Sequence, residues 1–545
     1  MQTEQAAETV EPDTKIRDRF SPRLAPLVGF LIFLPTLWYG FVWDDRYGIV
    51  ENPSLRSWKT LALTLWGKMD PTVAMYRPVT GAAVFFMFQF FGLNAWGYHL
   101  ASISLHALVC FLTYRIALQL SGKRPVAVFA SLLFAVHAAH LEAVAWISAV
   151  AEPLVASAVL SGLLCYLRYR RARQNKWLAA TCLCLFIGLL TKETAIILPL
   201  LLLALEFTFA NWDFGNLRRD LPLIASLAGT GLVYVTMRHF AYTGFVYNES
   251  KIPFSTLLLT WPSLLLIYCR HLVIPTPLSP FYDSSYVTTV NASLWVPLLA
   301  LIAIAAIVYF GTKFIGNDSL IRFCALAMAI SIIPALDLNI FQFREIMHDR
   351  FLYIPSIFFS ILVGQLLFGY HGKRDLTQEV SGKNSPGTIP IALGVCLILL
   401  NVAALLIQSP VWKNDMALMS YAVRVSPGNP RPVFTLATMQ LERGDLPQAE
   451  LLLEHVVQLA PAPKAWFLLG QTRMRLGHPD SAEQPLRQAI AAAPGRSGYH
   501  FALGQCLQVL GRTAEARAEF EAEIGVGSDY KDVASHALMR LQPAN

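Results

Sequence analysis

Long apolar segments recur through the first 408 residues and constrain this chain more than any other feature. The plainest cover residues 24–42, 126–136, 221–237, 294–310, 351–368 and 389–407. A helix needs about 20 apolar residues to cross a hydrocarbon core of about 30 Å, and the shorter segments reach that length with weakly polar flanks. Charged residues make up 14% of the chain, against about 25% in an average soluble protein. The sequence therefore predicts an all-α, polytopic membrane helix bundle.

Clusters of Lys and Arg predict the direction in which the chain crosses. They lie at 15–23, 123–124, 168–176, 218–219, 313–322 and 373–374. Cytoplasmic loops are enriched in these residues, so we expect a cytoplasmic N-terminal tail, residues 1–23. The segments expected outside are 43–97, 137–152, 192–193 and 337–350. About 11 spans result if residues 253–273 lie along the outer face or dip into the membrane and return, with an ordinary crossing as the alternative. An odd number places the C-terminus outside.

The cysteines and the net charge exclude two other classes of protein. None of the eight cysteines forms a CxxC pair, and most lie inside apolar segments, where they serve as small buried side chains. The net charge of +7 does not indicate a nucleic-acid partner, because residues 413–545 hold 13 Lys and Arg against 13 Asp and Glu. The positive excess flanks the membrane segments instead.

Residues 409–545 carry a repeat with a period near 34. Gly444, Gly477 and Gly511 are 33 and 34 residues apart, and Pro461 and Pro494 close the first two units. This period and these small residues are typical of tetratricopeptide repeats, which stack pairs of antiparallel helices into an α-solenoid. We expect about three repeats after a membrane domain at 24–408, serving either as a spacer or as a groove for a protein partner.

An acidic pair follows the first apolar segment. Asp44 and Asp45 end the sequence Phe-Val-Trp-Asp-Asp at 41–45 and open the outer loop 43–97. A carboxylate at a membrane surface can act as general base toward an acceptor hydroxyl. The alternative is a solvated loop start without a chemical role.

Further polar residues lie at predicted outer ends of the apolar segments. His137 and His140 are three residues apart on one expected helix face, whereas Glu142 falls off that face, so we expect a hydrogen-bonded cavity lining and no metal. The basic residues on this side are Arg77, Lys192, Arg344 and Arg350. Together they can hold a phosphate; the alternatives are snorkelling and ion pairs, such as Lys192 with Glu193.

An ordered set of short motifs resembles one known family. The motifs are Phe-Val-Trp-Asp-Asp at 41–45, Tyr-Arg-Pro at 76–78, Gly-Tyr-His-Leu at 97–100, His-Ala-Ala-His-Leu-Glu at 137–142, Lys-Glu at 192–193 and Arg-Phe-Leu-Tyr at 350–353. In this order they resemble the transmembrane and tetratricopeptide-repeat proteins, which in animals are O-mannosyltransferases with the GT-C fold. The likeness covers nearly the whole chain. Ala138 stands where the family pattern has a proline, and the three repeats are fewer than in animal members.

The resemblance implies a role for each residue of the site. Asp44 and Asp45 would hold the catalytic base, and Arg350, Tyr353, Arg77 and Lys192 would bind the phosphate of a polyprenyl-phosphate sugar donor. The cavity lining would comprise His99, His137, His140, Glu142, Glu193, Arg344 and His348. One displacement at the anomeric carbon would invert it. No metal or other cofactor is required, although a divalent cation is compatible with the scheme.

We therefore expect a membrane glycosyltransferase that acts on a protein Ser/Thr or a glycan hydroxyl at the outer face. Alternatives are an oligosaccharide, lipid or surface-polymer transferase of the same fold, a transporter, or a scaffold that recruits partners through its repeats. The expected partners are the lipid bilayer, the donor lipid and the acceptor, with no nucleic acid. We expect a bacterial inner membrane with the N-terminus cytoplasmic and the repeats periplasmic; an endoplasmic-reticulum membrane is the eukaryotic equivalent.

Overall fold

The chain forms two compact helical units. The computed structural model describes residues 13–65, 76–209, 217–241, 252–283, 285–314, 318–340, 346–370, 387–527 and 529–541. Every regular element among these residues is helical. The first unit comprises Met1–Pro280 and Ser284–Asp415, and the second comprises Phe281–Asp283 and Met416–Asn545. The division at residue 415 lies a few residues beyond the boundary predicted at 408.

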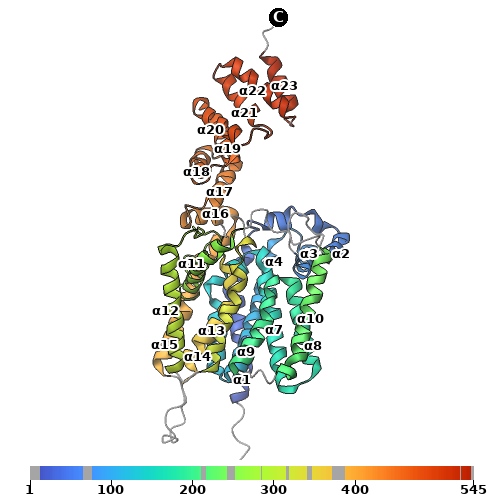
Figure 1. Ribbon diagram of the computed structural model, residues 1–545, viewed down its shortest axis with the longest axis vertical. Coiled ribbons are helices and arrows are strands. Elements are labelled where there is room, and N and C mark those ends of the chain that lie inside the picture. The colour runs from blue at the N-terminus through green and yellow to red at the C-terminus, as the bar shows by residue number, and fades with distance from the viewer. Residues whose placement is uncertain are drawn as a thin grey trace, which may run out of the picture. The chain divides into compact units, whose positions relative to one another are not determined.

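The first unit is a bundle whose long helices stand side by side (Figure 1). They are α1 (Asp13–Ile32), α4 (Ala95–Ser121), α5 (Arg124–Val136), α7 (Ala151–Ala172), α8 (Asn175–Thr191), α9 (Ile197–Phe209), α10 (Leu217–Ala241), α12 (Ala292–Phe314), α13 (Ser319–Ile332), α14 (Pro355–Phe368) and α15 (Thr388–Gln408). The helix α1 begins at Asp13, inside the predicted N-terminal tail.

Eight helices among the described residues are long and apolar enough to cross a membrane, or nine if a pair of helices bent by 52° at His137 counts as one span. This confirms a polytopic membrane bundle. The eight include α11 (Phe254–Val273), whereas α8 and the apolar segment Pro22–Trp38 are shorter than the length required. The predicted total of about 11 spans therefore stays a prediction.

Polar contacts distinguish the two ends of the bundle. At one end, which we call the basic end, Lys123 donates to the carbonyl of Gly369, and Arg170 pairs with Glu206. At the other, which we call the site end, Asp45 bonds to Ser148 and Arg77 bonds to Glu193. Segments 43–97, 137–152, 192–193 and 337–350, which were expected on one face, contribute to contacts at the site end.

The helix α11 keeps both of its ends near the site end. Ile252, just before it, donates its N–H to Asn339, and Trp261 within it donates to the carbonyl of Leu336. Near its C-terminus His271 contacts Asp349. Since Leu336, Asn339 and Asp349 all belong to the connection between α13 and α14, α11 follows that connection. Since α11 is also long and apolar enough to cross a membrane, the position predicted for residues 253–273 stays a prediction.

The loop after α1 folds into short helices with a core of their own. These are η1 (Leu34–Trp38), η2 (Arg46–Val50), η3 (Pro53–Arg56), α2 (Trp58–Leu65) and α3 (Pro78–Phe91). Ile49, Leu55 and Phe85 pack with Tyr98 of α4 and with Ile147 ahead of α7. Buried apolar side chains therefore anchor the loop that carries Asp44 and Asp45 to the bundle.

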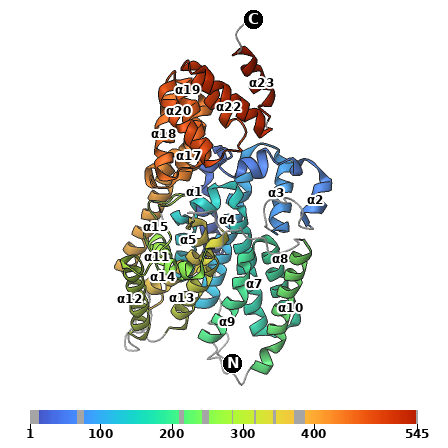
Figure 2. The same ribbon diagram turned by 45° about the horizontal axis from the view of Figure 1, so that its top comes forward.

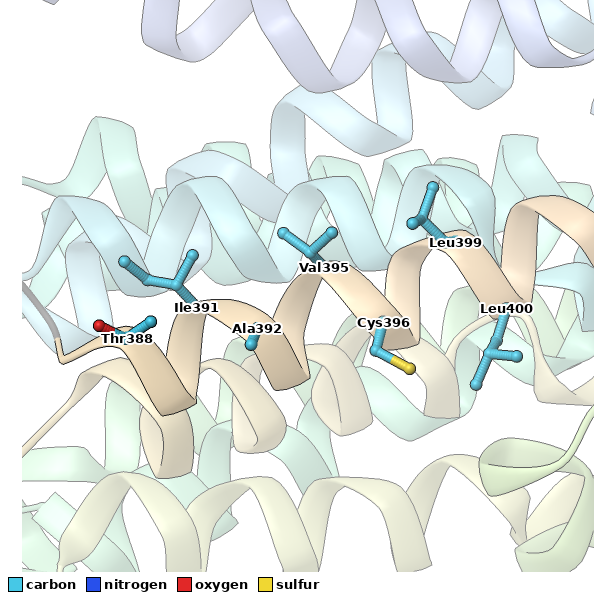
Figure 3. A pocket seen from close by; sticks show the side chains of 7 residues that line it. All are labelled: Thr388, Ile391, Ala392, Val395, Cys396, Leu399 and Leu400. Carbon is cyan, nitrogen blue, oxygen red and sulfur yellow. The ribbon is translucent and has the colours of Figure 1, made fainter.

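One face of α15 is almost entirely apolar. An open hollow of about 550 Å³ runs along this helix, and every residue lining it belongs to α15. Figure 3 shows the side chains of these residues. Thr388 and Cys396 are the only ones with a heteroatom, and Leu399 and Leu400 are about 60% exposed. A surface of this kind suits contact with lipid chains and offers no group for chemistry.

The second unit is the predicted α-solenoid. After α16 (Asp415–Val425), its helix pairs are α17 (Pro430–Arg443) with α18 (Leu446–Leu459), α19 (Pro463–Arg475) with α20 (Pro479–Ala492), and α21 (Tyr499–Val509) with α22 (Thr513–Val526), followed by α23 (Lys531–Arg540). The three pairs confirm the three predicted repeats, and Figure 2 shows them stacked in sequence.

Glycines serve two purposes in these repeats. Gly444, Gly477 and Gly511 have φ between +77° and +82° in the turn inside each pair, a conformation that side chains with a Cβ rarely adopt. Gly470 and Gly504 permit close packing instead. A Cβ on Gly470 would lie 2.5 Å from Leu486, and one on Gly504 would lie 2.6 Å from Phe520.

Candidate functional site

A strained residue precedes the acidic pair. Trp43 has φ +55°, an outlier for a bulky side chain. Its N–H donates to Asp415 Oδ1 at 2.6 Å, and its ring stacks on Trp146 with centroids 4.7 Å apart. Such backbone strain persists only where several contacts fix it, and it is common at functional sites.

The turn at Trp43 sends the two aspartates into different surroundings. Asp45 is completely buried: its Oδ2 accepts from Val42 N at 3.0 Å, and its Oδ1 accepts from Ser148 N and Oγ at 2.8 and 2.5 Å. Asp44 is exposed at the site end. The structure thus separates a buried carboxylate that fixes the loop from an exposed one that a substrate can reach.

Burial raises the pKa of Asp45 to about 7, although its hydrogen bonds to Ser148 and Val42 oppose the shift. A pKa near neutrality suits a general base. Geometry argues against that role, because three donors already occupy both oxygens of Asp45 and the side chain has no exposed surface. The burial of Asp45 therefore counts for more than its raised pKa, and the exposed Asp44 is the better candidate for a general base.

Arg350 lies beside an aromatic surface next to Trp43. Its guanidinium is 5.2 Å from the ring centroid of Trp146 and forms an ion pair with the buried Glu142. The backbone N–H of Arg350 also donates to Glu142 at 3.1 Å, and His348 Nδ1 lies 3.4 Å from the same carboxylate. Arg350 keeps 17% of its side chain exposed, so a phosphate can approach it.

Lys192 is the most deeply buried cation of this group. It pairs with Glu152, each side chain being 6% exposed, and its Nζ lies 4.7 Å from the ring centroid of Phe351. Burial lowers the pKa of Lys192; Glu152 opposes this effect, while the charges of Arg77 and Arg350 add to it. The expected pairing with Glu193 is therefore wrong, since Glu152 takes that place.

Glu193 instead joins two arginines. Arg77 donates to its Oε2 through Nε at 3.0 Å and through Nη2 at 2.9 Å, and Arg238 donates to its Oε1 at 3.0 Å. Burial alone would raise the pKa of Glu193, but the two positive charges outweigh it and lower the pKa to about 2. Arg238 was not among the residues predicted from the sequence. It could have been found as a basic residue at the predicted outer end of the apolar segment 221–237.

Across these ion pairs, Arg77, Lys192, Arg238 and Arg350 share the carboxylates Glu142, Glu152 and Glu193. Four cations thus share three carboxylates in one network of ion pairs. Another missed pair, His271 Nδ1 with Asp349 Oδ1 at 2.9 Å, lies beside it and is almost fully buried. Arg77 and Arg350 keep 28% and 17% of their side chains exposed, and arginine at such a surface can bind an anion.

The histidines of the site lie deeper than predicted. The expected continuous helix through His137 and His140 breaks at His137 because the His137 side chain accepts the N–H of Ala139 and Asn401 accepts that of Ala138. His140 Nε2 donates to Ser356 Oγ at 2.7 Å. Both rings are fully buried, so they pack the base of the site.

Tyr353 also belongs to this buried layer. It is completely buried, and its hydroxyl lies 2.8 Å from Nδ1 of His106. His106 Nε2 lies 3.1 Å from the carbonyl of Ala135, which makes Nδ1 the acceptor of the tyrosine proton. His99 is buried as well, edge-on to Tyr39. These positions suit packing better than direct contact with a phosphate.

Two predictions from the sequence remain untested: the role of Arg344 and the absence of a required metal. Arg344 lies outside those residues. Within the described part of the chain, no group of three or more His, Cys, Asp or Glu side chains is arranged to hold a metal ion. The expectation that no metal is required stays a prediction.

Known proteins share both parts of this architecture. The family described as dolichyl-phosphate-mannose-protein mannosyltransferase matches residues 81–247, and the tetratricopeptide repeat matches residues 434–497 and 467–529. A protein O-mannosyl-transferase of Caenorhabditis elegans is 25% identical over 467 residues, which cover 83% of this chain and 64% of the relative. The chain is similar to the transmembrane and tetratricopeptide-repeat O-mannosyltransferases. This confirms the resemblance that the motifs indicated.

Two further relatives are also described as protein O-mannosyl-transferases. The human protein O-mannosyl-transferase TMTC3 is 25% identical over 551 residues, covering 89% of this chain and 53% of its own length. Tmtc1 of Drosophila melanogaster is 31% identical over 280 residues, covering 49% of this chain and 30% of itself. The chain thus spans between about a third and two thirds of the length of these three relatives. These relatives are animal proteins, so they do not support the predicted bacterial inner membrane.

Proposed function

We propose that the chain is a membrane glycosyltransferase that moves a mannosyl-type sugar from a polyprenyl phosphate to a protein Ser or Thr hydroxyl. One observation carries the proposal: Arg350 keeps 17% of its side chain exposed and lies over Trp146, whose ring stacks on Trp43 next to the exposed Asp44. The exposed guanidinium groups of Arg350 and Arg77 can bind the phosphate of a sugar donor. The names of the relatives agree with this choice of donor and acceptor.

In the proposed reaction, Asp44 takes the proton of the acceptor hydroxyl. The hydroxyl oxygen forms a bond to the anomeric carbon as the bond from that carbon to the phosphate oxygen breaks, which inverts the carbon. The leaving phosphate gains negative charge, and Arg350 and Arg77 stabilise it because their guanidinium groups are partly exposed. Asp45 holds the loop in place, and the reaction needs no cofactor.

The positive-inside pattern supports a site end that faces away from the cytoplasm. A transferase for an oligosaccharide diphosphate, whose donor carries one phosphate more, is the alternative. The mass of the lipid product separates these alternatives, since the two phosphate groups differ by one phosphoryl unit.

The test is sugar transfer by the purified full chain, with mannosyl polyprenyl phosphate and a Ser/Thr peptide. Asp44→Asn should lower turnover by about 10²- to 10⁴-fold, the usual contribution of a general base. Glu51→Gln is the matched control, because Glu51 is an exposed carboxylate of the same loop paired with Arg46. Equal activity of Asp44→Asn and Glu51→Gln would exclude Asp44 as the base.

A further inference from the structure

An apolar groove of about 310 Å³ lies between α7, α9 and α10, outside the site described above. Pro199 and Leu203 of α9 line one side, and Leu227, Ala228 and Gly231 of α10 line the other. On this side the lining extends from Ile196, just before α9, to Glu206 of α9, a rise of about 15 Å at 1.5 Å per residue. Its shape and lining suit a single hydrocarbon chain.

The two polar side chains of the groove lie toward the basic end of the bundle. Tyr166 OH donates to Glu206 Oε1 at 2.6 Å, and Arg170 Nε lies 2.8 Å from the same oxygen. Glu206 is 9% exposed, whereas the Arg170 side chain keeps 29% of its surface exposed. A polar head at Arg170 and an apolar chain along α9 would therefore match the groove.

Further cations lie around Arg170, from the end of α7 to the beginning of α8. Arg168, Arg171, Arg173 and Lys176 are all exposed. Arg168 lies over the ring of Trp177 at 4.7 Å, and Arg173 lies over the ring of Tyr169 at 5.5 Å. Aromatic rings with Lys and Arg are typical of the level of lipid headgroups, and basic pockets between membrane helices bind anionic headgroups.

We propose that this groove binds an anionic phospholipid from the leaflet at the basic end. One acyl chain lies between α9 and α10, and the phosphate contacts Arg170 and the exposed cations around it. This orientation is opposite to that of the proposed sugar donor, whose phosphate lies beyond the other end of α9, near Glu193 and Arg77. The phospholipid is therefore a bound structural lipid and not the substrate.

Two glycines of α10 provide a matched pair of variants. Neither Gly229 nor Gly231 has a heavy atom within 4 Å of an added Cβ, but only Gly231 lines the groove. Gly231→Leu therefore fills the groove, and Gly229→Leu adds the same side chain one position outside the lining.

The experiment is native mass spectrometry of the full chain released from vesicles of equal parts phosphatidylglycerol and phosphatidylcholine. We expect retained phosphatidylglycerol in the parent chain and in Gly229→Leu, and its loss in Gly231→Leu. The double variant Arg171→Gln/Arg173→Gln should lower the preference for phosphatidylglycerol by roughly 30-fold, at about 1 kcal/mol for each cation, without altering the groove.

Three results would overturn the proposal. They are equal retention in the two glycine variants, equal retention of phosphatidylcholine, and a polyprenyl phosphate as the retained molecule. None of these results bears on Asp44, because the groove residues lie outside the proposed site.

Discussion

The repeat unit and the site end of the bundle are both built from short helices, yet their contacts differ in range. In the repeats, Gly470 packs against Leu486 and Gly504 against Phe520 in the partner helix of the same pair. At the site end, Asp45 and Ser148 are 103 residues apart, Arg77 and Glu193 are 116 apart, and Arg350 and Glu142 are 208 apart. The first region depends on local packing, and the second depends on charges from distant segments.

This difference teaches how each region should respond to mutation. A repeat contacts mainly its neighbours, so the effect of a substitution there should stay within the solenoid. At the site end each buried charge has a particular partner, and removing one partner leaves the other uncompensated. Four predictions test the comparison, from the largest expected effect to the smallest.

Lys192→Met should cost about 3–5 kcal/mol of unfolding free energy, because it leaves the buried Glu152 without its cation. The double variant Lys192→Met/Glu152→Leu should recover most of that loss, since both charges are then absent. Thermal unfolding of the membrane unit in detergent, followed by tryptophan fluorescence, measures both. If the single and double variants lose equal stability, the pair does not behave as a buried ion pair.

Gly504→Ala should cost about 1–3 kcal/mol in the repeats, because the new Cβ would lie 2.6 Å from the ring of Phe520. Gly525→Ala is the control: it also lies in a repeat helix, but nothing stands within 4 Å of its Cβ. Circular dichroism on heating should show a lower transition for the first variant only. A drop in the stability of the membrane unit would contradict the expectation that substitutions in the repeats act only within the solenoid.

Asp415→Ala removes the acceptor of the Trp43 N–H and should cost about 1–2 kcal/mol. Because the strain at Trp43 then lacks one of its restraints, we also expect faster proteolysis of the loop that follows. Limited digestion and mass spectrometry locate the cuts. Asp445→Ala, which removes an N-cap inside the repeats, should leave digestion of this loop unchanged.

Glu193 should make the smallest contribution, and one that depends on pH. Its pKa is about 2 in the folded chain against 4.5 ordinarily, so its stabilising effect is present above pH 4.5 and is lost as the pH falls toward 2. Since the side chain is 35% exposed, solvent screening keeps the effect to about 1 kcal/mol or less. Arg77→Met should flatten the stability profile between pH 5 and pH 3; an unchanged profile would contradict the assignment.

The sequence predicted the local features of the fold. The apolar segments and the period near 34 each follow from short-range rules, and the bundle and the three helix pairs confirm them. The distribution of Lys and Arg among the loops also predicted which segments lie together at the site end. The break at His137 could be predicted only in part. A proline at position 138, as in the family pattern, would indicate the end of a helix, but this sequence has Ala138 and the chain still bends there.

The partners within the site could not be predicted from sequence. Nothing near Lys192 in sequence identifies Glu152 as its counter-ion, or pairs Asp349 with His271. The turn at Trp43, which separates Asp44 from Asp45, depends on Trp146 and on Asp415, some 370 residues away. Such contacts arise from tertiary packing, so motifs indicate the residues of the site but not their pairing.

The contact between Trp43 and Asp415 also has a consequence for substrate capture. Asp415 is the last residue of the first unit, and Met416 begins the repeats. Any protein that binds the repeats is therefore tethered to a point one residue beyond the loop contact that positions Asp44. Tethering makes the second encounter intramolecular, with an effective concentration on the order of millimolar for a short linker. For the proposed transferase, an acceptor held by the repeats would therefore stay on the same chain as Asp44.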